Sequence, residues 1–245
     1  MAKPKKNDDR RARLEAMRRE AQRAERRRTM AVIGICAVVA VAIIAATGYY
    51  LLTQDEPVAD ASFTDGGTIG ASGDSAGCDN IGLRAADGSA DHAPAGTQID
   101  YPHSPPAFGQ HWAEQAPPGT TFYTVEDGPE VEQLVHNLEH GYTVLWYDET
   151  IADDPEALSQ VEAIAQPFAG RQDPGGKFIA APWTSDDGAF PEGKHVALTH
   201  WSADGEAASD QGQGDWLYCA EPSADVVSDF MAKFPSLDSL EPNAA

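Results

Sequence analysis

The chain has 245 residues and a formal net charge of −22, with 39 Asp and Glu against 17 Lys and Arg. This composition excludes collagen-like, coiled-coil and disulfide-dense classes of protein. A sequence pI of about 4.4 argues against nucleic acid as a partner, because binding to phosphates requires clustered Lys and Arg. The length accommodates one domain with appendages, or two small domains.

The charges are divided unevenly along the chain. Residues 1–29 hold 12 basic and 5 acidic residues, whereas residues 53–245 hold 5 basic and 34 acidic residues. Between them, residues 30–52 contain no charged side chain, and as a helix this run would be roughly 34 Å long, enough for a hydrocarbon core of about 30 Å. We therefore predict a single-pass transmembrane helix at 30–52 in the plasma membrane, with a basic cytoplasmic arm at 1–29 and the C-terminal part extracytoplasmic. The alternative is a cleaved signal peptide, whose apolar core is usually shorter.

The part beyond the apolar run divides into three segments. Residues 53–77 are rich in Gly, Ser, Ala and Asp and predict a flexible acidic linker. Residues 78–234 are expected to form one extracytoplasmic domain, and residues 235–245 a disordered tail. Cys78 and Cys219 lie near the two ends of this domain, and in an oxidising compartment they most simply form one disulfide. A metal–thiolate pair is the alternative, although no CxxC motif supports it.

The predicted elements of this domain alternate between strands and helices. A proline-rich loop at 101–118 is followed by a strand at 121–125, and Gly128-Pro129 begins a helix that ends at Gly141. A strand at 142–147 and a helix from Pro155 to about Ala169 come next. Strands at 177–183 and 195–201, a surface loop at 203–215 and a helix at 223–234 complete the domain. This order predicts an α+β fold: one N-terminal transmembrane helix plus a single α/β sandwich domain with one small sheet.

Three polar side chains with metal-binding chemistry lie together on the first of these helices. His136, Glu139 and His140 point away from its apolar face, and two histidines at i and i+4 can share one divalent cation. The string His-x-x-Glu-His is also the pattern of the inverted zincins, in which the glutamate is the general base of a hydrolase. No distal glutamate stands out as the further ligand that such a peptidase needs. The alternative is structural, with both imidazoles hydrogen-bonded or solvated at the end of the helix.

Four further histidines lie in or beside predicted ordered elements. His103 and His111 flank the proline-rich loop and His195 and His200 bracket a strand, whereas His92 is expected to lie in a plain loop. If three histidines converge they form a site for Zn or Cu, because imidazole suits both metals and softer Met or Cys ligands are missing nearby.

Two blocks, SPPAFGQH at 104–111 and LVHNLEHGYTVLWY at 134–147, together resemble a bacterial family labelled domain of unknown function 3105. Its members have a short cytoplasmic arm, one N-terminal anchor and an outer domain, with a Ser-Pro-Pro…Gly-x-His loop and a His-x-Leu-Glu-His-Gly turn. These motifs map onto Ser104, Pro105, Pro106, Gly109 and His111, and onto His136, Leu138, Glu139, His140 and Gly141. KFIAAPWT and HVALTHW look like the family's later strands, so the resemblance covers about 95–202. Ala107, Phe108 and Gln110 depart from the commoner loop residues, which bears on the shape of the loop.

The activity of that family is undefined, so the resemblance implies candidate residues and no reaction. It suggests a metal site of His111, His136 and His140, with Glu139 as fourth ligand or as a group that orients the histidines. Pro105, Pro106 and Gly109 would shape the loop, and Gly141 would end the helix. The same residues could instead join the loop to the helix for structure alone.

Three functions follow. We favour a metal-binding envelope protein that takes Cu or Zn as its cofactor or cargo. A non-catalytic accessory subunit with a membrane-protein partner and a metal-dependent hydrolase are the alternatives. The lipid bilayer is the partner of residues 30–52 in each case.

Overall fold

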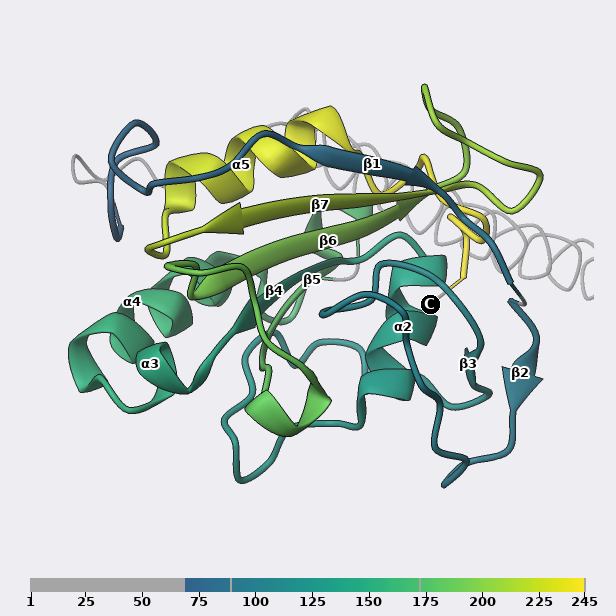
Figure 1. Cartoon of the computed structure of the whole chain (residues 1–245), viewed down its shortest axis with the longest axis horizontal. Helices are drawn as coiled ribbons and strands as arrows, with labels where there is room; N and C mark the ends of the chain where they lie inside the picture. The colour runs from purple at the N-terminus through teal and green to yellow at the C-terminus, as the bar shows by residue number, and fades with distance from the viewer. Residues whose placement is uncertain (1–68, 89, 172, 245) are drawn as a thin grey trace, which may run out of the picture. The chain divides into compact units, whose positions relative to one another are not determined.

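The computed structural model describes residues 69–88, 90–171 and 173–244 (Figure 1). The predicted cytoplasmic arm, the predicted transmembrane helix and linker residues 53–68 lie outside the described residues. Within the part that is described, no helix is long and apolar enough to cross a membrane.

A mixed five-stranded sheet forms the centre of the described domain, with the strands in the order β1-β7-β6-β4-β5. The strands β4 and β5 run parallel, and the other neighbours are antiparallel. A second sheet consists of two short parallel strands, β2 and β3. The bounds are β1 (Gly82–Ala85), β2 (His92–Ala93), β3 (His111–Trp112), β4 (Thr143–Tyr147), β5 (Phe178–Pro182), β6 (Val196–Ser202) and β7 (Gln213–Cys219).

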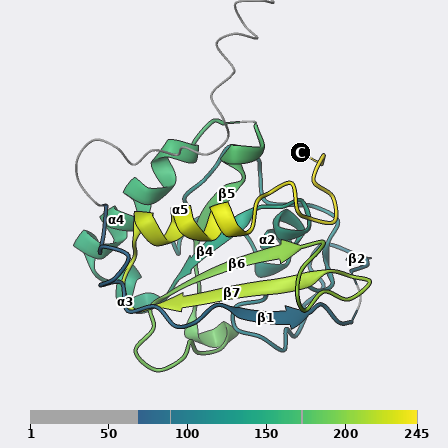
Figure 2. The ribbon, with the colours of Figure 1, turned by 90° about the horizontal axis from the view of Figure 1, so that it is seen from above.

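Helices pack on both faces of the large sheet, which gives a mixed α+β fold (Figures 1 and 2). One face is covered by α2 (Val131–Glu139) and the proline-rich loop, and the other by α4 (Pro155–Ala165) and α5 (Ala224–Lys233). The short helix α3 (Glu149–Ala152) and three 3-10 turns, Gln166–Phe168, Pro174–Gly176 and Ser185–Asp187, lie in the connections.

The sequence of β4 shows why the sheet has two covered faces. Val144 and Trp146 pack into the core beside α2, whereas Leu145 and Tyr147 pack into the core beside α4 and α5. Successive side chains of a strand point to opposite faces, so a strand buried on both sides must be apolar throughout. All five residues of β4 are buried accordingly.

The helix that carries the predicted site, α2, begins later than the sequence predicted. Glu130 has an extended backbone and is the N-cap, so Pro129 lies before the helix and not at its first position. The reason is a contact that stops the helix at Glu130, whose backbone N–H donates to the side chain of Gln133 at 3.2 Å. At the other end, Gly141 has a φ of +90°, as a helix-ending glycine requires.

Four further elements differ from the predictions. Residues 121–125 form no strand, because only Phe122 pairs, with Ala180 of β5. The helix from Pro155 ends at Ala165 and continues as a 3-10 turn. The predicted loop at 203–215 contains the start of β7, and β1 was not predicted at all. The partner of β1 is the distant β7, with Leu83 opposite Asp215, and a pairing between distant segments leaves no local pattern.

The predicted disulfide is confirmed. Cys78 and Cys219 are joined with an S–S distance of 2.03 Å across 141 residues of sequence. The bond ties the segment that precedes β1 to the last residue of β7. It therefore links the N-terminal part of the described domain to its central sheet.

Residues 235–244, predicted to be disordered, instead pack against the end of α2. The ammonium group of Lys177 donates to the carbonyl oxygens of His140, Pro242 and Ala244 at 2.7, 3.0 and 3.0 Å. The backbone N–H of Glu241 donates to the carbonyl oxygen of Glu139 at 3.1 Å. These bonds satisfy carbonyl groups that the helix end leaves open, which explains why this polar segment is ordered.

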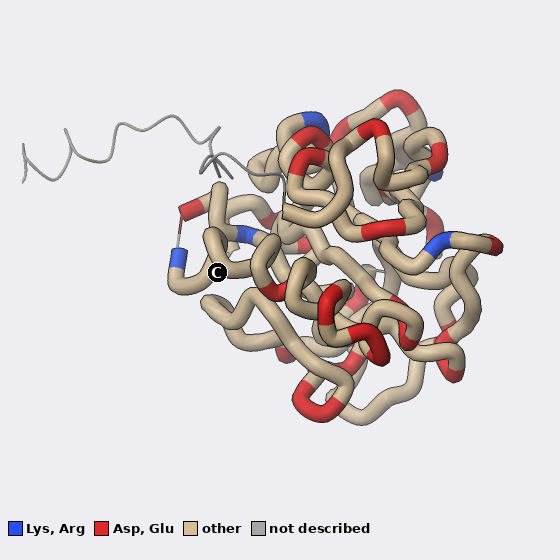
Figure 3. Tube along the Cα trace, turned by 90° about the vertical axis from the view of Figure 1, so that its left-hand side faces the viewer, with Lys and Arg blue, Asp and Glu red and all other residues tan. Residues whose placement is uncertain are grey.

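Acidic residues are spread over the loops and helices of the described domain, and basic ones are few (Figure 3). The distribution matches the acidic excess of residues 53–245. Such a surface attracts cations in general and gives no specificity, so any selective site must come from local geometry.

Candidate metal centre

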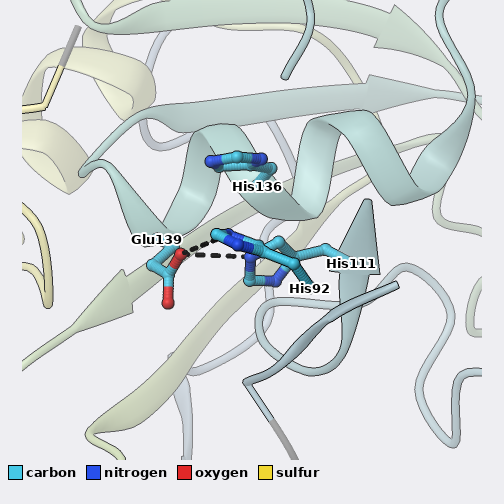
Figure 4. Close-up of side chains that lie close together, drawn as sticks. All are labelled: His92, His111, His136 and Glu139. Atoms are coloured by element: carbon cyan, nitrogen blue, oxygen red, sulfur yellow. Dashed lines mark ion pairs between the residues drawn. The ribbon is translucent and has the colours of Figure 1, made fainter. Parts of the chain in front are cut away.

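Four potential ligands converge from three elements. His136 and Glu139 project from α2, His111 from β3 and His92 from β2 (Figure 4). The parallel pairing of β2 with β3 places His92 directly beside His111. One nitrogen of each histidine and one oxygen of Glu139 all lie within 4.8 Å of one another.

Most of this cluster is removed from water. The exposed fraction is 0% for His111, 6% for His136 and 7% for Glu139. His92 is the solvent-facing member, because 48% of its side chain is exposed. Oε2 of Glu139 lies 3.0 Å from Nε2 of His111 and 3.8 Å from Nε2 of His92. The cluster is therefore a buried site that meets solvent at His92.

Hydrogen bonds fix which nitrogen of each buried ring faces the cluster. Nδ1 of His111 lies 2.8 Å from the carbonyl oxygen of Gly109, and Nδ1 of His136 lies 2.7 Å from that of Trp112. A carbonyl oxygen only accepts, so each Nδ1 carries the proton and donates it. In the neutral ring, Nε2 then presents a lone pair, which is the arrangement of metal-binding histidines whose other nitrogen donates to a carbonyl group.

Two buried atoms meet at the centre of the cluster. Nε2 of His111 and Oε2 of Glu139 lie 3.0 Å apart as an ion-pair contact, and neither has another hydrogen-bond partner within the described residues. A divalent cation bound between them would take the place that a proton on Nε2 of His111 holds in the ion pair.

The electrostatics of the cluster favour ligands in their metal-binding forms. The pKa of His136 is lowered to about 4, mainly by burial and in smaller part by the neighbouring His140, His111 and His92, while the hydrogen bond to Trp112 acts in the opposite direction. Burial alone would raise the pKa of Glu139, but contact with His111 and the charges of His136 and His92 outweigh it and hold the pKa below its ordinary value. At neutral pH the ring of His136 is thus neutral and the carboxyl group of Glu139 is ionised.

His140, which the sequence analysis placed in the same site, belongs to a neighbouring group. Its Nε2 lies 3.1 Å from Nε2 of His136, and its Nδ1 lies 2.8 Å from Oε1 of Gln115. With Glu139 and Glu241 it forms a second set of potential ligands whose atoms lie within 4.8 Å of one another. The structure therefore brings His111, His136 and Glu139 together and sets His140 beside them.

The proline-rich loop that carries His111 is held against the large sheet by hydrogen bonds from β7. Trp216 donates to the carbonyl oxygen of Pro105 at 2.8 Å, and Tyr218 donates to that of Ser104 at 2.8 Å. Pro106 is buried next to them. Gly109 has a φ of +133°, which only glycine adopts without strain, and this turn directs its carbonyl oxygen at the ring of His111.

His92 is the ligand that sequence reasoning missed. It was assigned to a plain loop, and its pairing with β3 involves only two residues of each strand. The remaining histidines lie elsewhere in the described domain. His103 packs edge-on against Trp216, His195 pairs with Asp148 at 2.8 Å, and His200 is fully buried between two carbonyl oxygens. The pairing that places His92 beside His111 joins two separate segments, so no local pattern around His92 could have indicated it.

A model of the family described as Protein of unknown function (DUF3105) matches residues 92–244. The match begins at His92 and includes every residue of both ligand groups. It extends the resemblance noted in the sequence, which covered about 95–202, to the C-terminal segment. Neither a curated protein nor a solved structure matches the chain at a significant level. Because the match spans more than half of its residues, the chain belongs to the DUF3105 family of proteins of unknown function.

Proposed function

We propose that the protein is a membrane-anchored, extracytoplasmic protein that binds Zn²⁺ or Cu²⁺ through His92, His111, His136 and Glu139. One observation carries the proposal: one ligand atom from each of these four side chains lies within 4.8 Å of the other three, and three of the four side chains are buried. Nδ1 of His111 and Nδ1 of His136 each face a carbonyl oxygen, which leaves their Nε2 atoms for a metal. The anchor at 30–52 and the extracytoplasmic placement are part of the proposal and rest on the charge pattern of the sequence.

The donor set selects the class of metal. Three imidazole nitrogens and one carboxylate suit Zn²⁺ and Cu²⁺, whereas Cu⁺ prefers thiolates and thioethers. The two cysteines of the described domain are joined in the disulfide. Neither group of potential ligands contains a sulfur atom.

The arrangement favours storage or delivery of the metal over catalysis. A catalytic zinc site usually has three protein ligands and one open position, whereas here four protein side chains converge. His92 is the exposed ligand, so a cation would enter or leave on its side. An accessory subunit of a membrane complex would use the same anchor without needing a metal, and metal content separates these two functions.

The test is the metal content and metal affinity of the full-length chain. The protein is purified in detergent with a histidine-free tag that is then removed, stripped with a chelator, and titrated with Zn²⁺ and with Cu²⁺. We expect at least one tightly bound equivalent, and an affinity at least tenfold lower in His92→Ala, which removes a half-exposed ligand at little risk to the fold. His136→Ala should remove the tight equivalent.

The matched control is His195→Ala, because His195 is a histidine of similar exposure whose partner is Asp148, outside the cluster. It should bind metal like the wild type. If the wild type binds neither metal tightly, or if all three variants bind equally well, the cluster is not a metal site and the proposal fails.

A further inference from the structure

We propose that the protein holds a second divalent cation, bound by His140 and Glu241 and bridged to the first by Glu139. This inference deepens the proposed function and rests on it. The C-terminal segment, residues 235–244, would then supply one ligand, Glu241. The site would be a two-metal centre whose two positions have different ligands.

The ligand atoms of the second position are already assembled. Oε2 of Glu241 lies 3.4 Å from Nε2 of His140, and one oxygen of Glu139 lies within 4.8 Å of both ligand atoms. Nδ1 of His140 faces Oε1 of Gln115 at 2.8 Å, so Nε2 is the ring nitrogen that faces Glu241.

His136 and His140 lie side by side at the end of α2, with their Nε2 atoms 3.1 Å apart. Nδ1 of each ring faces an oxygen, of Trp112 and of Gln115 respectively. Nε2 of His136 would bind the first cation, beside His111, and Nε2 of His140 the second, beside Glu241.

Glu139 is placed to serve both positions, because it belongs to both ligand groups. A carboxylate has two oxygens and can bridge two cations, and two-metal sites in proteins hold their ions about 3.5–4 Å apart. The ammonium group of Lys177 lies near this end of α2, and it donates to three carbonyl oxygens. These bonds leave the carboxylates of Glu139 and Glu241 to offset the charge of the cations.

The position of Glu241 is fixed by the fold. Its backbone N–H donates to the carbonyl oxygen of Glu139, and Lys177 binds the carbonyl oxygen of the next residue, Pro242. Upstream, the carbonyl oxygen of Asp238 lies 3.2 Å from Nε2 of the buried His200. The side chain of Glu241 itself is 54% exposed, so the second position is the one that solvent reaches more easily.

The experiment is a titration of the full-length, metal-free protein with Cu²⁺, followed by measurement of bound copper and of the electron paramagnetic resonance signal. The variant is Glu241→Gln, which keeps the size of the side chain and removes its charge. Glu206→Gln is the control, because it removes one negative charge from an exposed loop outside both ligand groups. We expect two bound Cu²⁺ in the wild type and in the control, with a signal below that of two isolated ions because the bridged ions couple.

In Glu241→Gln we expect one bound Cu²⁺ with the full signal of an isolated ion. One bound ion in all three proteins would overturn the second position and leave the proposed function standing. Two ions in Glu241→Gln would remove Glu241 from the site and refute the assignment. No bound copper in any of them, with no Zn²⁺ binding either, would instead overturn the proposed function itself.

Discussion

The Asp215 carboxyl, on the buried centre of β7, should make the protein less stable as the pH rises through the mildly acidic range. Its exposed fraction is 0%, and it accepts hydrogen bonds from Oγ of Ser202 at 2.7 Å and from Nε2 of Gln213 at 2.6 Å. Burial raises its pKa from 3.8 to about 6, although the two hydrogen bonds act in the opposite direction. The folded protein therefore keeps a proton that the unfolded chain has already lost.

The sign and size of the effect follow from proton linkage. Below pH 3.8 the carboxyl is protonated in both states and costs nothing, and between 3.8 and about 6 the free energy of unfolding falls as the pH rises. A shift of this size corresponds to about 3 kcal/mol in full, of which about 2 kcal/mol should fall between pH 4.5 and 7.5.

The variant Asp215→Asn isolates this contribution because it cannot ionise. Its amide oxygen can still accept one of the two hydrogen bonds, and its amide group can donate to the hydroxyl of Ser202. Any loss in the free energy of unfolding caused by the substitution itself is therefore the same at every pH. Urea unfolding of both proteins at pH 4.5 and 7.5 should show the variant gaining about 2 kcal/mol on the wild type as the pH rises. A difference between the two proteins that stays constant across this range would refute the reasoning.

Three further predictions concern the frame around the candidate metal centre. Replacing both Cys78 and Cys219 with Ala should lower the free energy of unfolding by about 5 kcal/mol in denaturant titrations, because their bond closes a loop of 141 residues; a loss below about 1 kcal/mol would contradict it. Gly141→Ala should cost at least about 1 kcal/mol by the same assay, since φ is +90° and a Cβ would collide with the carbonyl oxygen of Ser236; unchanged stability would be inconsistent with this packing. Lys177→Met should speed hydrogen exchange at the backbone N–H of Glu241, because it removes the bond that Lys177 donates to the carbonyl oxygen of the next residue, Pro242. Equal exchange rates in the variant and the wild type would contradict this role of Lys177.

The elements with strong local patterns could be predicted from the sequence. The apolar run of β4 and the helix that begins at Pro155 appear where their patterns place them, because burial on both faces and the proline at the first helical position leave clear signals. The strands β1 and β7 have no such signal. Gly82, Gly214 and Asp215 are poor strand formers, and their pairing is fixed by neighbours across the sheet.

The same distinction applies to the candidate site. His136 and Glu139 could be identified because their spacing on a helix places them on one side, which is a local property. The place of His92 depends on a two-residue pairing with β3. That of Glu241 depends on the bond its backbone N–H donates to the carbonyl oxygen of Glu139, and on the bond from Lys177 to the next residue, Pro242. Contacts between distant segments carry no local pattern, so these two residues became visible only in the folded structure.

The order of the ligands along the chain separates the two positions during synthesis. His92, His111, His136 and Glu139 all lie within residues 92–139 and emerge from the ribosome before β4. Glu241 emerges only after every strand and helix of the described domain. A chain that stops before Glu241 would thus retain the ligands of the first proposed position and lack one ligand of the second, so binding at the second proposed position would report that translation had passed the described strands and helices.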